Sequence, residues 1–394
     1  MHAQRIIQEL LDKMCPSIHA KRRACVAKVV EASRVGGVGL LKMSRALASK
    51  TAIRHRIKCC DRLLSNVNLH EETMQIYGAL CHRVLPQHGR IAIIVDWSDL
   101  HPDGSTHFLR AAVIVKGRSF VLYEEVHAGK DYGSPAVHRT FLENLRPLLP
   151  PGCQPVLITD AGFRATWFKL ASELHYEWVG RIRNRDKVCA QDTNVWDGCK
   201  QWYEHATARA RTLGTFAYAK SNPVNCRLVA YKKPAQGRQR LTAFGKKAAS
   251  GKSKKNAASQ REPWLLAVSP SLAALSAKVI VALYAGRMQI EQTFRDAKNP
   301  YLGMGLSTSQ TRNRERLKIL LLIAALATYA LWLLGLAARQ TGYDVRYGSK
   351  KKAATTLSII SLAQFWIEEQ RPRPLSMRAL ADALRALTDL VRKI

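Results

Sequence analysis

Two short apolar segments that end in an aspartate are the first candidates for chemistry in this sequence. IAIIVD ends at Asp96, and PVLITD ends at Asp160. Both segments are predicted strands, because they are short, apolar and rich in β-branched residues. If the two strands are neighbours, both carboxylates lie at one edge of a sheet, where ligands gather in α/β folds. Acids at strand ends are common, so this pattern alone does not define a site.

A third carboxylate belongs to the segment LYAGRMQIEQTFRDAK, residues 283–298, which is predicted to form one helix. At 100° per residue, five polar side chains share a stripe about 80° wide that borders the apolar face. These are Tyr284, Arg287, Glu291, Arg295 and Lys298. The stripe is therefore predicted to line a cleft. The alternative is an exposed ladder of i±4 ion pairs around Glu291, each contributing only ~0.3 to 0.5 kcal/mol.

The chemistry of these side chains favours a hard cation. Three carboxylates without a cysteine or histidine cluster suit Mg²⁺ or Mn²⁺ better than zinc. Two such ions about 4 Å apart can activate an attacking oxygen and stabilise the leaving oxygen of a phosphodiester displacement. The neighbouring Arg287, Arg295 and Lys298 would then hold phosphates.

The spacing of the polar stripe also carries a family resemblance. The signature Y-(2)-R-(3)-E-(6)-K is matched by Tyr284, Arg287, Glu291 and Lys298. The surrounding segments VDWSD, TDAGF, KSNP, EPWLLA and RMQIEQTFRD are similar to the same group. On these motifs the sequence resembles DDE transposases of the insertion-sequence-four family, in the group that contains the transposase of the bacterial tetracycline-resistance transposon.

The resemblance implies a fold and a set of site residues. The fold class is α/β, an RNase H-like mixed sheet with a β-rich insertion and with helical regions at both ends. Asp96, Asp160 and Glu291 would be the catalytic, metal-binding triad with two Mg²⁺ or Mn²⁺ ions. Asp96 is preferred to Asp99, because Asp96 ends the apolar run whereas Asp99 is expected beyond the strand. Trp264 resembles the family's base-stacking tryptophan, and a core tryptophan at a strand end is the alternative.

The activity implied by the resemblance is cut-and-paste transposition. The enzyme would bind terminal inverted repeats, cleave them by hydrolysis, form and open a hairpin, and join the 3′ ends to target DNA. Its partners would be transposon-end DNA, target DNA and a second copy in a synaptic homodimer. The alternatives are an RNase H-like nuclease without strand transfer, and an inactive DNA-binding repressor derived from a transposase.

The charge of the chain agrees with a nucleic-acid partner. There are 62 Lys and Arg against 29 Asp and Glu among 394 residues, a net charge of +33. With 47% hydrophobic residues the chain is nevertheless globular. Residues 227–261 contain eleven Lys or Arg and no acid, which favours phosphate contact over a solubilising loop.

The N-terminal region offers a second basic surface. Its apolar positions Ile53, Ile57, Cys60 and Leu64 repeat at helical spacing, and Arg54, Lys58 and Arg62 form a neighbouring basic stripe. Ser44 followed by a short helix, a break near Lys50 and this second helix is compatible with a helix-turn-helix that binds DNA. A solvated basic helix is the alternative.

Changes in composition divide the chain into five regions. They are a helical region 1–85, a strand-rich region 86–190, a β-rich basic region 191–264, a helical region 265–345, and a helical region 346–394 suited to packing on the core or to dimerisation. The resemblance implies that the first binds DNA ends, that the second and fourth form the two parts of the catalytic core, with the helix of the signature in the fourth, and that the third is the insertion. Nine cysteines without zinc-ligand spacing and the charged N-terminus predict a cytoplasmic protein. The resemblance implies a bacterial protein that is associated with the nucleoid when bound to DNA. Residues 319–338 are long enough to span a membrane, but a buried core helix is favoured and no membrane partner is expected.

Overall fold

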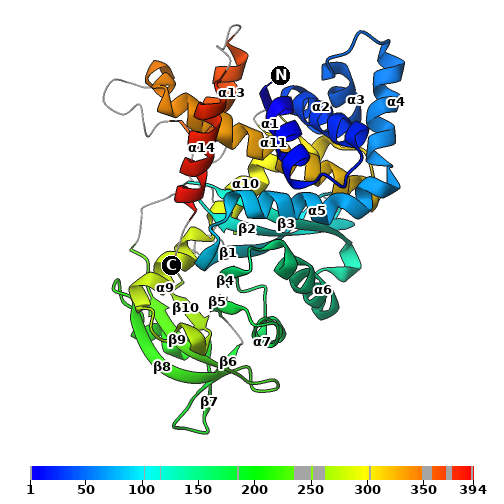
Figure 1. Cartoon of the computed structure of the whole chain (residues 1–394). Coiled ribbons are helices and arrows are strands. Elements are labelled where there is room, and N and C mark those ends of the chain that lie inside the picture. The colour runs from blue at the N-terminus through cyan, green and yellow to red at the C-terminus, as the bar shows by residue number, and fades with distance from the viewer. Residues whose placement is uncertain are drawn as a thin grey trace. The chain divides into compact units, whose positions relative to one another are not determined.

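The chain divides into two compact units, each described here by itself. The computed structural model describes residues 2–101, 103–115, 117–183, 186–234, 250–251, 262–300, 303–347, 357–369, 375–391 and 394. Unit 1 combines Met1–Gln154 with Met288–Ile394, and unit 2 is Pro155–Arg287. In Figure 1 unit 1 accordingly contains both the blue N-terminal helices and the orange-to-red C-terminal ones.

Unit 1 contains an antiparallel sheet of three strands in the order β3-β2-β1. The strands are β1 (His88–Asp99), β2 (Thr106–Ile114) and β3 (Ser119–Ala128), and β2 and β3 form an antiparallel hairpin. Directly opposite residues in antiparallel strands point to the same face of the sheet. One face packs against α6 (Pro135–Leu145), where Phe141 stacks on Tyr123 with ring centroids 5.2 Å apart. The other face packs against α10 (Gln289–Lys298).

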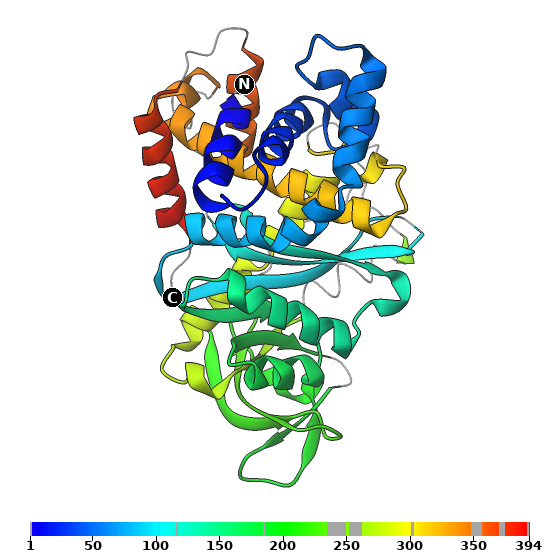
Figure 2. The same cartoon turned by 45° about the vertical axis from the view of Figure 1, so that its right-hand side comes forward.

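The helical part of unit 1 surrounds one long helix, α11 (Arg314–Gln340). By length and composition α11 could cross a membrane, but 94% of its most apolar window is buried inside the protein. It packs against helices from both ends of the chain, as Figure 2 shows for α1 and α2. Its Asn313 cap accepts a hydrogen bond from the backbone N–H of Arg316, which satisfies one of the free donors of the first turn. The burial supports the core-helix prediction.

The other helices of unit 1 lie around α11 and the sheet. They are α1 (His2–Met14), α2 (Ala20–Gly36), α3 (Leu40–Ala46), α4 (Ile53–Leu64), α5 (Val67–Val84), α13 (Ile359–Glu368) and α14 (Met377–Leu390), with short 3₁₀ turns at Gly129–Asp131, Arg146–Leu148, Leu306–Thr308 and Tyr343–Tyr347. The apolar face of α14 packs on α11, with Leu387 and Val391 buried. The packing of α14 on α11 agrees with one of the two expected roles for this face, packing on the core.

The N-terminal helices differ in detail from the helix-turn-helix prediction. Ser44 does not precede the short helix but lies inside α3, where its hydroxyl donates to the carbonyl of Leu40. Six residues, 47–52, then separate α3 from α4. Cys60 and Leu64 are buried, whereas Ile53 is 44% exposed, so the expected apolar face of α4 packs only toward its C-terminal end.

A largely buried glutamate on α2, which pairs with an arginine of the same helix and also bonds to α1, makes stability depend on pH. Glu31 and Arg34 are 12% and 11% exposed, and Glu31 Oε2 also accepts from the backbone N–H of Gln4 at 2.9 Å. Burial alone would raise the pKa of Glu31, but Arg34 and the Gln4 N–H outweigh it and lower the pKa to about 2. A glutamate in an unfolded chain titrates near pH 4.3. The depressed pKa therefore stabilises the fold above that pH, and this contribution is lost as the pH falls toward 2.

Glu31→Gln should accordingly lower the free energy of unfolding by about 2 to 3 kcal/mol at pH 7, and the two chains should converge as the pH approaches 2. Urea unfolding followed by circular dichroism at several pH values measures the difference. Glu9→Gln is the control, because its pair with Lys13 is solvent-exposed and should change stability by less than ~0.5 kcal/mol. A Glu31→Gln effect that is constant with pH would contradict the assignment.

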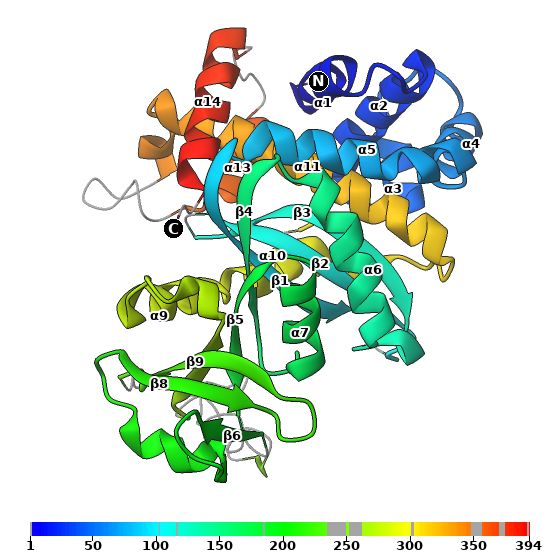
Figure 3. The same ribbon diagram turned by 60° about the horizontal axis from the view of Figure 1, so that its bottom comes forward.

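Unit 2 is a mixed sheet built around one parallel crossover. β4 (Gly152–Thr159) pairs in parallel with β5 (Glu177–Ile182). The connecting helix α7 (Ala165–Glu173) lies alongside β5 in Figure 3. The approach is close, because a Cβ on Gly180 would lie 2.2 Å from Phe168 Cζ, and Phe168 stacks on Trp178 at 4.5 Å between ring centroids. The glycine thus allows the helix to pack directly on the strand.

The remaining strands of unit 2 are antiparallel, and the strand order from β4 onward is β4-β5-β10-β9-β8-β6-β7. They are β6 (Lys187–Ala190), β7 (Trp196–Gly198), β8 (Arg211–Tyr218), β9 (Val224–Tyr231) and β10 (Trp264–Val268), accompanied by helix α9 (Ala277–Gly286) and 3₁₀ helices at Cys199–His205 and Pro270–Leu272. Most of the basic stretch 227–261 lies outside the described residues. Strands with flanking helices in both units confirm the predicted mixed α/β class.

Candidate active site

Asp96 lies within β1 and not at its end. The strand continues to Asp99, whose register partner on β2 is His107. The prediction that Asp99 lies beyond the strand is therefore wrong, because backbone pairing with β2 extends the strand past its apolar run. The distinction between the two acids has a different basis: side chains alternate along a strand, so Asp96 and Ser98 share one face whereas Asp99 points to the other.

The face of β1 that carries Asp96 is contacted by α10. Lys298 Nζ donates to Ser98 Oγ at 2.8 Å, and burial lowers the pKa of Lys298. Glu291 and Lys298 are seven residues apart, close to two helical turns, so they lie on the same side of α10. The helix that carries Glu291 therefore packs on the sheet face that carries Asp96, and the Glu291 side chain itself is exposed. Arg295, one turn from Glu291, is exposed.

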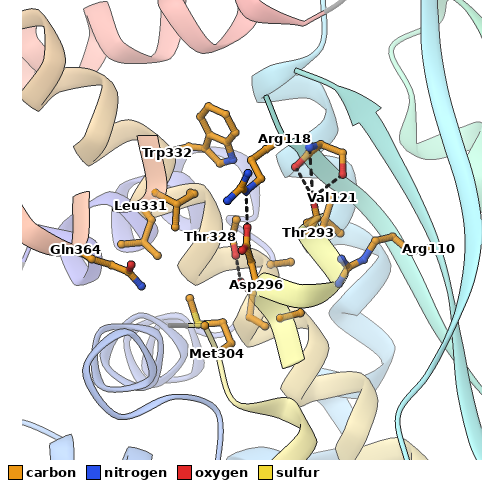
Figure 4. A pocket seen from close by; sticks show the side chains of 16 residues that line it. Arg110, Arg118, Val121, Thr293, Asp296, Met304, Thr328, Leu331, Trp332 and Gln364 are labelled. Carbon is orange, nitrogen blue, oxygen red and sulfur yellow. Dashed lines mark hydrogen bonds and ion pairs between the residues drawn. The ribbon is translucent and has the colours of Figure 1, made fainter. Parts of the chain in front are cut away.

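The opposite side of α10 is fixed by two polar contacts, which Figure 4 shows. Arg118 Nε donates to Asp296 Oδ2 at 2.7 Å, and the hydroxyls of Ser119 and Thr293 lie 2.7 Å apart. Between these contacts and Trp332 of α11 is a cavity of about 20 Å³. That volume holds about one water molecule. The cavity is too small for a substrate, so its contacts serve to hold the helix that carries Glu291.

Asp160 belongs to unit 2, where it follows the last residue of β4. Its Oδ1 accepts a hydrogen bond from the backbone N–H of Gly162 at 2.7 Å, an aspartate turn that directs the chain away from the strand. A Cβ on Gly162 would lie 2.9 Å from that same oxygen. The strand-then-acid pattern of the sequence is thus observed at this position.

The predicted single helix from Leu283 to Lys298 is two helices. α9 ends at Gly286 and α10 begins at Gln289. Arg287 and Met288 keep right-handed backbone angles, but the Arg287 N–H bonds to the Tyr284 carbonyl three residues back, a 3₁₀ turn that changes the rotation per residue. The prediction of one continuous polar stripe at 100° per residue is therefore wrong, and the division between the units falls at the same place.

Three of the predicted DNA-binding residues gather in unit 2. The ring centroids of Trp264 and Tyr284 are 4.9 Å apart in an edge-to-face arrangement, and Trp264 also contacts Tyr231 at 5.7 Å. The guanidinium carbon of Arg287 lies 6.0 Å from the Tyr284 ring. Tyr284 and Arg287 are buried, whereas Trp264 at the start of β10 is half-buried. Trp264 is thus supported from one side by aromatic contacts.

The predicted basic stripe of the N-terminal region is on the surface of unit 1. Arg54, Lys58 and Arg62 are all exposed on α4. Their spacing of four residues places them on one side of the helix.

Comparison with known protein families identifies the chain. The family described as the transposase DDE domain matches residues 87–328, more than half of the sequence. The chain belongs to this family. A search of curated proteins found no match. Membership establishes a DDE transposase domain with an RNase H-like fold, hence a transposase or nuclease enzyme with a DNA substrate.

DDE transposases generally use divalent metal ions. The side chains that could bind such an ion in this domain are carboxylates. Asp96 and Glu291 are carboxylates with no cysteine or histidine ligand set beside them, which suits a hard cation. Among the described residues no cluster of three His, Cys, Asp or Glu side chains is arranged to hold a metal ion. Unit 1 therefore carries two candidate oxygen ligands, Asp96 and Glu291, and unit 2 carries a third candidate, Asp160.

Several residues around the candidate site are absent from the sequence prediction. Ser98 binds Lys298, and Arg110 forms a buried ion pair with Glu124. A signal existed for Arg110, since it is the one charged residue in the apolar strand FLRAAVIV. No comparable signal marks Ser98, because its role depends on a helix 200 residues later in the chain.

Proposed function

We propose that this chain is a cut-and-paste DNA transposase of the insertion-sequence-four family that acts on terminal inverted repeats. The observation that supports this most directly is the contact between Lys298 and Ser98. It holds the helix of Glu291 on the sheet face of Asp96, in a chain that carries a transposase DDE domain. Asp96, Asp160 and Glu291 are the proposed catalytic triad.

The proposed cofactor is a pair of Mg²⁺ or Mn²⁺ ions held by these three carboxylates. When bound, the ions would supply Lewis-acid activation of the attacking oxygen and stabilisation of the leaving oxygen. The basic side chains have a separate role, since Arg287, Arg295 and Lys298 bind phosphates of the transposon end. Because Lys298 is anchored to Ser98, its ammonium group is held in place before DNA binds.

The proposed reaction has four steps on each transposon end. Water cleaves one strand and frees a 3′-OH, which attacks the opposite strand to form a hairpin. Hydrolysis opens the hairpin, and the 3′-OH then joins target DNA. We further propose that Arg54, Lys58 and Arg62 bind the end outside the cleavage site, and that two copies pair two ends as a homodimer in the cytoplasm, at the nucleoid.

The experiment that tests this proposal uses pre-cleaved transposon ends, the purified full chain and Mg²⁺. Joining of the labelled 3′ ends to a target plasmid supports the transposase. Cleavage of uncut ends without any joining would favour the RNase H-like nuclease. End binding without either reaction would favour the catalytically inactive repressor.

Trp264 is proposed to stack on a base displaced during hairpin formation. Base stacking on an aromatic ring contributes ~1 to 3 kcal/mol, so Trp264→Ala should slow hairpin formation about 5- to 150-fold. The first nick should change by less than about threefold, since it needs no displaced base. Time courses on denaturing gels separate the two products.

Two further variants control the Trp264 experiment. Trp264→Phe keeps an aromatic face and should recover most of the hairpin rate. Trp202→Ala removes another tryptophan of unit 2, which contacts Phe216 at 4.7 Å, and should not separate the two steps. Equal loss of nicking and hairpin formation in Trp264→Ala would reject the stacking role.

A further inference from the structure

Three charged residues form a row across the sheet of unit 1. Asp96 on β1 is the register partner of Arg110 on β2, and Arg110 is the partner of Glu124 on β3. Directly opposite side chains share a face, with Cβ atoms about 4.5 to 5.5 Å apart. One guanidinium therefore lies between two carboxylates, the proposed metal ligand on one side and a second acid on the other.

The guanidinium bonds to the far acid. Arg110 Nε donates to Glu124 Oε1 at 2.8 Å, and Nη2 lies 2.6 Å from the same oxygen. The two side chains are 2% and 1% exposed. Among the described residues, Arg110 Nη1 has no hydrogen-bond partner. A buried donor thus remains unused in the row that contains Asp96.

The guanidinium also packs between two aromatic rings. Its central carbon lies 4.8 Å from the ring centroid of Phe294 on α10 and 5.1 Å from that of Phe108 on β2. The two rings contact each other edge to face at 5.3 Å. Figure 4 shows Arg110 extending from its strand toward α10. The two rings restrict the position of the Arg110 guanidinium. A small movement of its nitrogen atoms is therefore enough to change the acid to which it bonds, Glu124 or Asp96.

We propose that Glu124 is a positioning residue that keeps the Arg110 guanidinium paired with itself and so prevents Arg110 from competing with a divalent cation for the Asp96 carboxylate. The inference rests on the proposed function, because it takes Asp96 as a metal ligand. Charged hydrogen bonds between arginine and carboxylate are strong, especially when buried. If Glu124 loses its charge, Asp96 becomes the acid opposite Arg110, and the guanidinium competes with the cation for the same oxygens.

The test is a Mn²⁺ titration of the full chain without DNA, with free Mn²⁺ measured by electron paramagnetic resonance. Binding at the proposed site is the part of the total Mn²⁺ binding that is lost in the Asp96→Asn variant. Glu124→Gln should raise the half-saturating Mn²⁺ concentration of this Asp96-dependent binding about tenfold. Loss of a residue that supports a metal ligand typically weakens metal binding by about this factor. The double variant Arg110→Met with Glu124→Gln has no competing charge and should return to within about twofold of the original chain.

Glu125→Gln is the matched control. Glu125 is the next residue along β3 and points to the opposite face, where it accepts hydrogen bonds from Tyr123 and Asn144. Its substitution should lower thermal stability without changing the half-saturating Mn²⁺ concentration. If Glu124→Gln is too unstable to titrate, Arg110→Met provides the test. Its half-saturating Mn²⁺ concentration should stay the same or fall. A rise in that concentration would overturn the inference.

The outcomes distinguish this inference from the proposed function. A Glu124→Gln chain that melts earlier but binds Mn²⁺ normally overturns the inference alone. A double variant that binds as weakly as Glu124→Gln also overturns it, because a purely structural role of Glu124 explains that result. An original chain without any Asp96-dependent Mn²⁺ binding would overturn the proposed metal centre, and this inference with it.

Discussion

Asp96→Asn and Glu291→Gln are each expected to lower DNA-end cleavage about 10³-fold or more. A bound metal ion stabilises the transition state by several kcal/mol, and each 1.36 kcal/mol is a factor of about ten in rate. Both substitutions keep the shape of the side chain and remove only the charge. The hydrogen bond from the Trp97 N–H to Asp96 Oδ1, at 2.9 Å, can be kept by the asparagine oxygen. Loss of rate should therefore occur without loss of fold.

The measurement is single-turnover cleavage of a labelled transposon end, together with end binding by gel shift. Asp99→Asn is the control, because Asp99 is on the same strand but exposed on the opposite face. It should retain cleavage within about threefold, well below the effect of losing a metal ligand. Full activity in Asp96→Asn with loss in Asp99→Asn would reverse the assignment of the first ligand.

Gly335→Ala is expected to destabilise unit 1 by about 2 kcal/mol or more. Gly335 lies on α11 where α13 crosses it, and a Cβ there would be 2.1 Å from the carbonyl oxygen of Ile359 and 2.7 Å from its Cγ2. Alanine favours a helix by ~1 kcal/mol over glycine. The clash is with backbone, so relieving it must separate two helices that share a core. We expect the packing loss to exceed the gain in helix propensity.

Gly78→Ala is the matched control for this effect. It is also a helical glycine of unit 1, on α5, but its Cβ would meet only the Cδ2 of Leu148 at an ordinary 3.6 Å. The substitution should be neutral or raise stability by up to ~1 kcal/mol. Thermal unfolding of both variants gives the comparison, and effects of the same sign would show that the close approach at Gly335 is not important.

The parts of the fold that the sequence predicts well are those where a local pattern and burial agree. The apolar runs before Asp96 and Asp160 are strands. The long apolar segment of α11 is a buried helix because helices from both ends of the chain cover it. In each of these segments, the apolar pattern along the sequence and the burial of the strand or helix in the fold favour the same secondary structure.

The departures arise where distant segments decide the local structure. β1 continues to Asp99 because β2 supplies hydrogen-bond partners, which no property of residues 97–99 indicates. The helix from Leu283 breaks at Arg287, although the apolar spacing is continuous across the break. The contact of Lys298 with Ser98 and the pair of Arg110 with Glu124 both join residues on separate elements. Spacing along one element cannot predict such pairs.

The interrupted sequence of unit 1 has a consequence for synthesis of the protein. Its first part ends at Gln154 and its second begins at Met288. About 130 residues must be translated between them, which takes roughly 7 to 27 seconds at 5 to 20 residues per second. During that interval α1 to α6 and the sheet lack α10 and α11, and so lack their main apolar partner. The nascent chain should remain open to chaperones until α11 has left the ribosome.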